Sequence, residues 1–185
     1  AKRAAAPRRR QAEAGRLRVL LLFLILVAFA RLTWDLGGKD LWWDETLSLQ
    51  RAESSLPDIL LGRLVMGDGF TQVTTTDQHP FFFFLLQGFL LRLAGNSEYV
   101  LRFVSAMAAT LLVPSVWVFA RHLQAADVFP VTAPYWAALL ASISPFFLWY
   151  GQEARPYALW AVLALLSVYL LLRMVEPDRT PWTWA

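Results

Sequence analysis

The chain has 185 residues, of which 57% are hydrophobic, and its mean hydropathy is +0.44. Soluble domains average about 45–50% apolar residues, so the excess must be covered by lipid or by other protein. The sequence contains no cysteine, which excludes a disulfide framework, a thiolate metal site and a cysteine nucleophile.

Charge is segregated along the chain, although the net value is only +3. Before and at the start of the first apolar run, seven basic residues face one acid, Glu13. Residues 35–79 reverse this balance, with eight acids against three basic residues. A basic segment can bind nucleic acid, but one that abuts an apolar run more often keeps its end of the chain in the cytoplasm. We therefore expect residues 1–16 to form a cytoplasmic tail and expect no nucleic-acid partner.

The first apolar run, residues 17–34, is predicted to be a retained transmembrane helix. It is longer than the apolar part of a typical signal peptide, and no small-residue cleavage site precedes the acidic stretch. A helix needs about 20 apolar residues to cross a bilayer. With the tail inside, residues 35–98 become an external loop, in which we expect a short helix near 43–54.

The second apolar run, "FFFFLLQGFLLRL" at residues 81–93, is short and contains Gln87, Gly88 and Arg92. Apolar runs of about 10–14 residues are more often interfacial or re-entrant than spanning. The Phe-rich face beside polar positions suits a helix that lies in the headgroup plane. The sequence therefore predicts a juxtamembrane helix on the outer surface.

Three further spans follow, at residues 99–120, 131–150 and 156–172. This arrangement delivers four basic or potentially basic residues to the cytoplasm: Arg121, His122, Arg173 and Arg179. If 81–93 crossed instead, the same four would lie outside, so the positive-inside rule favours the arrangement with four spans.

The fold class predicted is an all-α integral membrane protein with about four transmembrane helices and juxtamembrane helices in its first external loop. Pro114 and Pro145 are expected to kink the second and third spans, which membrane helices tolerate. Residues 173–185 return to the cytoplasm. Because the chain opens on Ala and stops just after a membrane segment, we expect it to be part of a longer protein.

Three clusters on the expected outer face carry the chemistry: "WWDE" (42–45), "TDQHP" (76–80) and "YGQEARPY" (150–157). Carboxylates at a membrane surface suit general-base catalysis or the binding of a hard divalent cation. Arginine suits a phosphate through its bidentate fork. A site that gathers both would suit a phosphate-bearing lipid substrate.

Each cluster also has a simpler reading. Asp44 could cap the following helix, beside tryptophans that only anchor the interface. Asp77 and His79 could belong to a turn before a helix that starts at Pro80. Glu153 and Arg155 could form a weak surface ion pair, and Arg102 could snorkel toward the headgroups.

Taken together, four motifs in order resemble the N-terminal part of the polyprenyl-phosphate-dependent glycosyltransferases of the GT-C fold. The resemblance is to the bacterial dolichyl-phosphate-mannose protein mannosyltransferase and aminoarabinose transferase group, and it covers about residues 17–175. The matching stretches are "DE" (44–45), "DQHP" (77–80), "GNSEYVLRFVSA" (95–106) and "SPFFLWYGQEARPYAL" (144–159). Phe81 stands where a second proline is usual in the family.

The resemblance implies that a sugar moves from a polyprenyl phosphate to an acceptor at the extracytoplasmic face, usually with inversion. The resemblance implies that Asp44 is the general base and that Glu45 shapes the same loop. It implies that Asp77 and His79 orient the acceptor or bind a divalent metal ion. The implied substrate- and phosphate-binding residues are Arg155, Glu153 and the weaker candidate Arg102. The implied partners are a polyprenyl-phosphate-linked sugar, a lipid, glycan or protein acceptor, membrane lipids and other membrane subunits. The implied location is the bacterial plasma (inner) membrane.

Family members have roughly a dozen spans, so this segment alone is expected to be inactive and to work as part of a longer glycosyltransferase. An alternative from another class is a non-catalytic structural or accessory subunit derived from the same fold within a larger membrane complex. A transporter is disfavoured, since the centres of the four expected spans lack ionisable residues.

Overall fold

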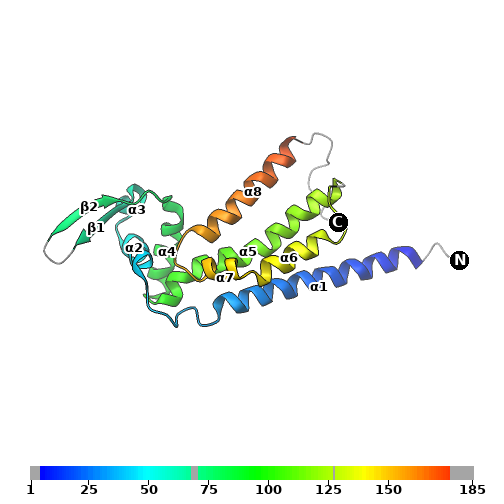
Figure 1. Ribbon diagram of the computed structural model, residues 1–185, viewed down its shortest axis with the longest axis horizontal. Coiled ribbons are helices and arrows are strands. Elements are labelled where there is room, and N and C mark those ends of the chain that lie inside the picture. Colours follow the sequence, from blue (N-terminus) through cyan, green and yellow to red (C-terminus); the bar gives the residue numbers. More distant parts are fainter. Residues whose placement is uncertain (1–4, 68–70, 127, 176–185) are drawn as a thin grey trace.

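Residues 5–67, 71–126 and 128–175 are described by the computed structural model, and within these ranges the chain forms eight helices and one β-hairpin (Figure 1). The helices are α1 (Ala5–Thr33), α2 (Trp43–Glu53), α3 (Leu56–Leu61), α4 (Phe81–Ala94), α5 (Glu98–Ala125), α6 (Ala133–Ile143), α7 (Pro145–Gly151) and α8 (Tyr157–Val175). Helices α1, α5 and α6 lie side by side along the long axis, while α2, α3, α4 and the hairpin gather at the end away from the N-terminus (Figure 1).

Helix α5 is the centre of the packing and contacts α1, α4, α6, α7 and α8. Small residues on α5, among them Ala106 and Ala109, let α1 approach closely with Leu24, Ala28 and Leu32. Close approach over small residues is the usual way in which apolar helices pack in a membrane.

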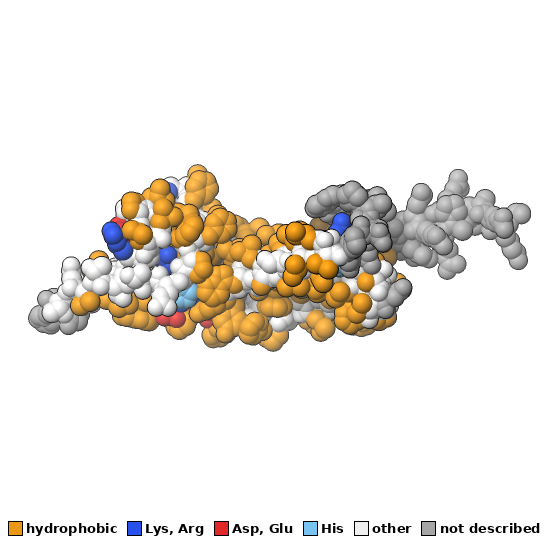
Figure 2. Space-filling model, turned by 90° about the horizontal axis from the view of Figure 1, so that it is seen from above, with side chains coloured by type: hydrophobic (Ala, Val, Ile, Leu, Met, Phe, Trp, Pro, Cys, Tyr) orange, Lys and Arg blue, Asp and Glu red, His pale blue; other side chains and the backbone are white. Residues whose placement is uncertain are grey.

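Two helices of the described ranges, α5 and α8, are long and apolar enough to cross a membrane. Half of the apolar window of α5 is buried in the protein, whereas α8 leaves most of its apolar surface exposed. Figure 2 shows hydrophobic side chains over much of the visible face, and most of the visible charged groups lie near the end that carries α2, α3 and α4. The described chain is therefore mostly helical, with an apolar body and a polar end.

The expected third span is interrupted, because residues 131–150 form two helices rather than one. Helix α6 ends at Ile143, and Ser144 then caps α7 by accepting a hydrogen bond from Phe147 N at 3.4 Å. Pro145 is the first residue of α7, where its missing N–H costs nothing. Pro114, in contrast, lies within α5, which continues across it.

A β-hairpin within the first loop departs from the all-α prediction. Strand β1 (Arg63–Gly67) pairs antiparallel with β2 (Gln72–Thr76) in the register Arg63↔Thr76 to Gly67↔Gln72. Gly62, at φ 70°, turns the chain from α3 into β1. Its carbonyl accepts a hydrogen bond from Asp77 N at 2.7 Å, so the hairpin returns the chain to α3 just before His79.

Helix α4 coincides with the expected juxtamembrane helix and packs against α2 through Gly88. A Cβ at this position would lie 2.5 Å from the backbone oxygen of Ala52 and 2.6 Å from Arg92 Nη1. Phe83 and Phe84 on the same helix are buried, while Phe89 is exposed. The helix thus buries one side against the protein and leaves an apolar side outward.

Gly88→Ala is expected to destabilise the protein by about 1–3 kcal/mol. The added Cβ would clash with the backbone oxygen of Ala52, which cannot move aside as a flexible side chain does. The control is Gly15→Ala, since a Cβ at Gly15 would meet nothing within 4 Å. Thermal unfolding in detergent micelles measures both variants. Equal melting temperatures for the two would contradict the close packing of α4 on α2.

Candidate functional site

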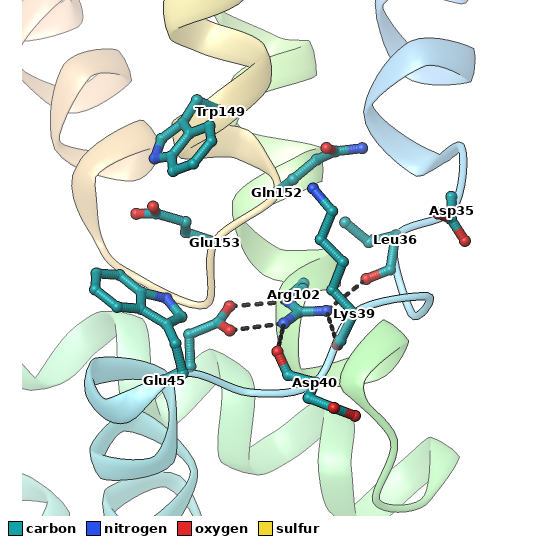
Figure 3. Close-up of a pocket in the computed structure, with 10 residues that line it drawn as sticks. Asp35, Leu36, Lys39, Asp40, Glu45, Arg102, Trp149, Gln152 and Glu153 are labelled. Carbon is teal, nitrogen blue, oxygen red and sulfur yellow. Dashed lines mark hydrogen bonds and ion pairs between the residues drawn. The ribbon is translucent and has the colours of Figure 1, made fainter.

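Two buried charges of the polar end, Glu45 of α2 and Arg102 of α5, form an ion pair (Figure 3). Arg102 Nε lies 2.8 Å from Glu45 Oε1, and Arg102 Nη2 lies 2.7 Å from Oε2. The remaining N–H groups of Arg102 donate to the carbonyls of Leu36, Lys39 and Asp40. A guanidinium has five N–H donors, and five hydrogen bonds use them here, which leaves none for a phosphate.

Glu45 also fixes the segment between α7 and α8, because its Oε1 accepts a hydrogen bond from Ala154 N at 2.8 Å. The Glu45–Arg102 pair therefore joins α2, α5, the loop before α2 and the loop before α8. In this arrangement both residues position the site, and their charged atoms face each other rather than a substrate.

Asp44, by contrast, has a side chain that is 36% exposed. Helix α2 begins at Trp43 and its N-cap is Trp42, so Asp44 does not cap the helix, as the simpler reading allowed, but lies in its first turn. The nearest cation is Arg155, whose Nη2 lies 4.0 Å from Asp44 Oδ2. No hydrogen bond to the Asp44 carboxylate occurs among the described residues, so both its oxygens are open to a proton donor.

Arg155 is held beside Asp44 by the backbone and by neighbouring side chains. Its Nη1 donates to Asp44 O at 3.3 Å and lies 3.5 Å from Ser48 Oγ. Ser105 Oγ donates to Arg155 O at 3.0 Å and so fixes its backbone. Only 6% of Arg155 is exposed, and its Nε is buried without a hydrogen-bond partner.

Asp77 and His79 complete the cluster and link it to α2. His79 Nδ1 lies 2.5 Å from Asp77 Oδ1, and His79 Nε2 lies 3.3 Å from Arg155 Nη2. Since a guanidinium can only donate, Nε2 is the acceptor and the ring proton is on Nδ1, where it is donated to Asp77. Trp160 of α8 stacks on the His79 ring with centroids 5.6 Å apart.

Arg51, which sequence reasoning did not single out, anchors this arrangement from α2. It is 1% exposed and donates to Asp77 Oδ2 at 2.7 Å, to His79 O at 2.9 Å and to the carbonyl of Ile59. Its guanidinium also lies over the Phe84 ring, 4.1 Å from the centroid. In the sequence Arg51 is only a basic residue in the last turn of a short helix, a position that the helix dipole favours anyway.

The pKa of Asp77 reflects these partners. Burial by itself raises the pKa of the carboxyl, but hydrogen bonds from His79 and Arg51 outweigh that effect and hold the pKa below its usual value. Asp77 is therefore ionised at neutral pH, and its charge keeps His79 and Arg51 in place.

Glu153 lies two residues before Arg155, and both side chains are buried rather than paired on the surface. Burial raises the pKa of Glu153; a hydrogen bond from Trp149 and the charge of Arg155 oppose this shift, while the carboxylates of Glu45 and Asp44 reinforce it. Glu153 borders two cavities, of about 350 Å³ and about 590 Å³, that share Trp42, Trp149 and Glu153 in their walls.

Glu153→Gln is expected to remove a pH dependence of stability. The folded state binds the Glu153 proton more tightly than the unfolded state, so stability falls as the pH rises from the ordinary value of 4.5 through the raised pKa. The amide cannot ionise, so the melting temperature of the variant should exceed that of the wild type by a margin that grows across this window. A margin that stays constant with pH would contradict the raised pKa.

A divalent metal ion does not fit Asp77 and His79 as they stand. Asp77 Oδ1 faces His79 Nδ1, Asp77 Oδ2 faces Arg51, and His79 Nε2 faces Arg155. Two guanidinium groups would repel a cation placed there. Within the described ranges, no three His, Asp or Glu side chains are grouped as a metal site.

The structure thus brings Asp44, Asp77, His79 and Arg155 together from three distant segments, with Glu153 close by in sequence. Glu45 and Arg102 lie behind them as a buried support. The described chain thus combines two helices that are long and apolar enough to cross a membrane, α5 and α8, with a cluster of polar groups at one end.

The family follows from a comparison with known proteins. The model of the dolichyl-phosphate-mannose-protein mannosyltransferase family matches residues 78–185, which is more than half of the chain. The chain belongs to this family, a group of membrane glycosyltransferases of the GT-C type, which confirms the family seen in the sequence. The match begins at residue 78, so the motifs with Asp44, Glu45 and Asp77 lie before the matched residues. No curated protein and no solved structure matches the chain significantly.

Proposed function

We propose that the protein transfers a sugar from a polyprenyl phosphate to an acceptor hydroxyl, with Asp44 as the general base. The family supports a glycosyl transfer with a lipid-linked donor. The observation that carries the assignment of the base is the open carboxylate of Asp44, 4.0 Å from a buried Arg155 whose Nε is unpartnered.

In the proposed step, the acceptor oxygen attacks the anomeric carbon and its proton passes to an Asp44 carboxylate oxygen. The bond between the anomeric carbon and the phosphate oxygen breaks, and its electron pair stays on the phosphate. Arg155 meets the growing negative charge, as preorganised donors do in enzymes of this kind. Attack opposite to the leaving group inverts the anomeric centre.

The neighbouring residues would act through these two. Asp77 and His79 fix Arg155 from one side, because His79 Nε2 accepts its hydrogen bond. Glu45 holds the loop that contains Arg155, through Ala154 N, and Arg102 holds Glu45. The proposed roles of Asp77, His79, Glu45 and Arg102 are therefore positional.

We also propose that the site faces the extracytoplasmic side of a bacterial plasma membrane. Helix α1 runs from the basic N-terminal segment to the loop that precedes the site. Because the positive-inside rule keeps basic segments in the cytoplasm, the other end of α1, with Asp44 beyond it, would lie outside. The acceptor there would be a lipid, a glycan or a protein.

The test compares membranes from cells that make the protein with membranes from cells that lack its gene. Each preparation receives short-chain polyprenyl phosphates that carry radiolabelled mannose, glucose, galactose or arabinose, and in a parallel reaction the matching nucleotide sugars. Gene-dependent transfer from a prenyl phosphate, without a nucleotide sugar, is expected. Equal transfer in both membranes with every donor would overturn the proposal and favour the accessory-subunit alternative.

A further inference from the structure

The smaller of the two cavities, which we name the polar cavity, lies beside the buried Glu45–Arg102 pair (Figure 3). Its volume of about 350 Å³ is at the low end of the range of small-molecule sites, about 300–1,000 Å³. The loop before α2, helix α7 and the segment that follows α7 all contribute walls, through Lys39, Trp149 and Glu153 among others. A cavity of this size admits one ring-sized group rather than a long chain.

The charges around the polar cavity disfavour an anion. Glu45 and Arg102 neutralise each other and use their polar atoms on each other and on the backbone. The other charged groups of the lining are the carboxylates of Asp35, Asp40 and Glu153 and the ammonium of Lys39. Carboxylates outnumber cations even when Glu153 carries a proton, so a phosphate would be repelled here.

The walls combine flat apolar faces with groups that form hydrogen bonds. Two indoles, those of Trp42 and Trp149, line the cavity, and Trp42 is half exposed. Figure 3 shows Lys39 reaching toward Gln152 and Glu153, with Trp149 above them. The amide of Gln152 is fixed, because its Nε2 donates to Trp34 O at 3.0 Å.

This mixture matches the surface of a sugar ring, whose faces are C–H groups and whose rim is hydroxyls. Aromatic faces take up the apolar surface, and a few convergent polar groups set the orientation. The Glu153 carboxyl group accepts hydrogen bonds, and Lys39 adds a donor.

We propose that the polar cavity binds one sugar ring without an anionic group, with Trp42 and Trp149 against its faces and with Lys39 and Glu153 at its hydroxyls. The inference rests on the proposed function only in that the protein handles a glycosyl group. The ring belongs either to the donor or to the acceptor. The second cavity, which shares Trp42, Trp149 and Glu153 and is otherwise lined mostly by apolar and aromatic residues, leaves room for an apolar extension of the same molecule.

Saturation-transfer NMR on the purified protein in lipid nanodiscs tests the proposal. The probes are the methyl pyranosides of mannose, glucose, galactose and arabinose, with inorganic phosphate as the anionic probe. At least one glycoside should show saturation of its ring C–H protons, and phosphate should not displace it. If no glycoside of this panel binds to protein that is folded by its thermal transition, the proposal is overturned.

Two pairs of variants locate the binding. Trp42→Ala should weaken the affinity for the glycoside at least tenfold, whereas Trp136→Ala, an exposed tryptophan on α6 away from the cavity lining, should leave it unchanged. Glu153→Gln keeps a neutral hydrogen-bonding group and should retain binding, whereas Glu153→Leu should lose it severalfold. Equal weakening by Trp42→Ala and Trp136→Ala would overturn the location.

Competition distinguishes the two sources of the ring and separates this inference from the proposed function. Inhibition by the glycoside that is competitive with the prenyl-phosphate sugar assigns the ring to the donor, and inhibition competitive with the acceptor assigns it to the acceptor. Asp44→Asn should bind the glycoside like the wild type while it loses transfer. Glycoside binding without any gene-dependent transfer would support the sugar site in the polar cavity and contradict the proposed function. Transfer without glycoside binding would support the proposed function and contradict the sugar site.

Discussion

Asp44→Asn is expected to lower the rate of sugar transfer by about 10²- to 10⁴-fold, the contribution typical of a positioned general base. The amide has nearly the shape of the carboxylate but cannot take the acceptor proton. Because Asp44 is 36% exposed and its ion pair with Arg155 is long, at 4.0 Å, its replacement should change stability by no more than about 1 kcal/mol. Transfer from the prenyl-phosphate donor and the melting temperature should be measured on the same preparation.

The matched control is Asp58→Asn, which changes a carboxylate of nearly equal exposure, 37%, on α3. Asp58 interacts with Ser55 and Arg63 rather than with Arg155, so transfer should continue. Turnover near the wild-type rate in Asp44→Asn would remove the general base from the proposed mechanism.

Arg102→Ala is expected to destabilise the protein by about 3–5 kcal/mol, because it leaves the Glu45 carboxylate buried without its counter-charge. The variant also loses the hydrogen bonds to Leu36, Lys39 and Asp40, which hold the loop before α2. Unfolding in a mild denaturing detergent, followed by circular dichroism, gives the loss of stability.

The control for Arg102 is Arg63→Ala, since Arg63 is 58% exposed and its nearest carboxylate oxygen, on Asp58, is 3.6 Å away. A pair of this kind contributes about 0–1 kcal/mol. The double variant Glu45→Leu with Arg102→Met removes both charges and should be more stable than Arg102→Ala alone. If Arg102→Ala and Arg63→Ala lose the same amount of stability, the buried Glu45–Arg102 pair does not support the site as described.

Much of the helical architecture follows from apolar periodicity and length. The short helix expected near 43–54 coincides with α2, and the run at 81–93 coincides with α4. The span expected at 99–120 lies within α5, and the one expected at 156–172 lies in α8 except for residue 156, because few polar residues interrupt these stretches.

Features that depend on neighbours were not predictable in the same way. The hairpin was missed because "RLVMG" and "QVTTT" are short and only weakly alternating, and the turn at Gly62 and the bond from Asp77 N to Gly62 O do not show in the sequence. At Pro145 the sequence predicted a kink, but with Ser144 as a cap the same proline can also begin a new helix, which only the backbone reveals.

The candidate site shows the same division. Its carboxylates, His79 and Arg155 could be predicted from the sequence, because they are polar residues directly beside apolar runs. The residues that hold them in place could not be predicted in this way. That Arg102 would use all its donors on Glu45 and three carbonyls, or that Arg51 would reach Asp77, depends on contacts between residues 26 to 66 positions apart.

The hydrogen bond from Ala154 N to Glu45 determines when the site can be assembled during translation. Since translation proceeds from the N-terminus, the carboxylates of the first loop emerge from the ribosome more than a hundred residues before the backbone that Glu45 binds. During that interval Arg102 is already made and can neutralise Glu45, whereas Asp44 awaits Arg155. The cluster of Asp44 and Arg155 is therefore assembled last, when α7 and the start of α8 have been synthesised, and a nascent chain halted before residue 154 carries Asp44 without Arg155.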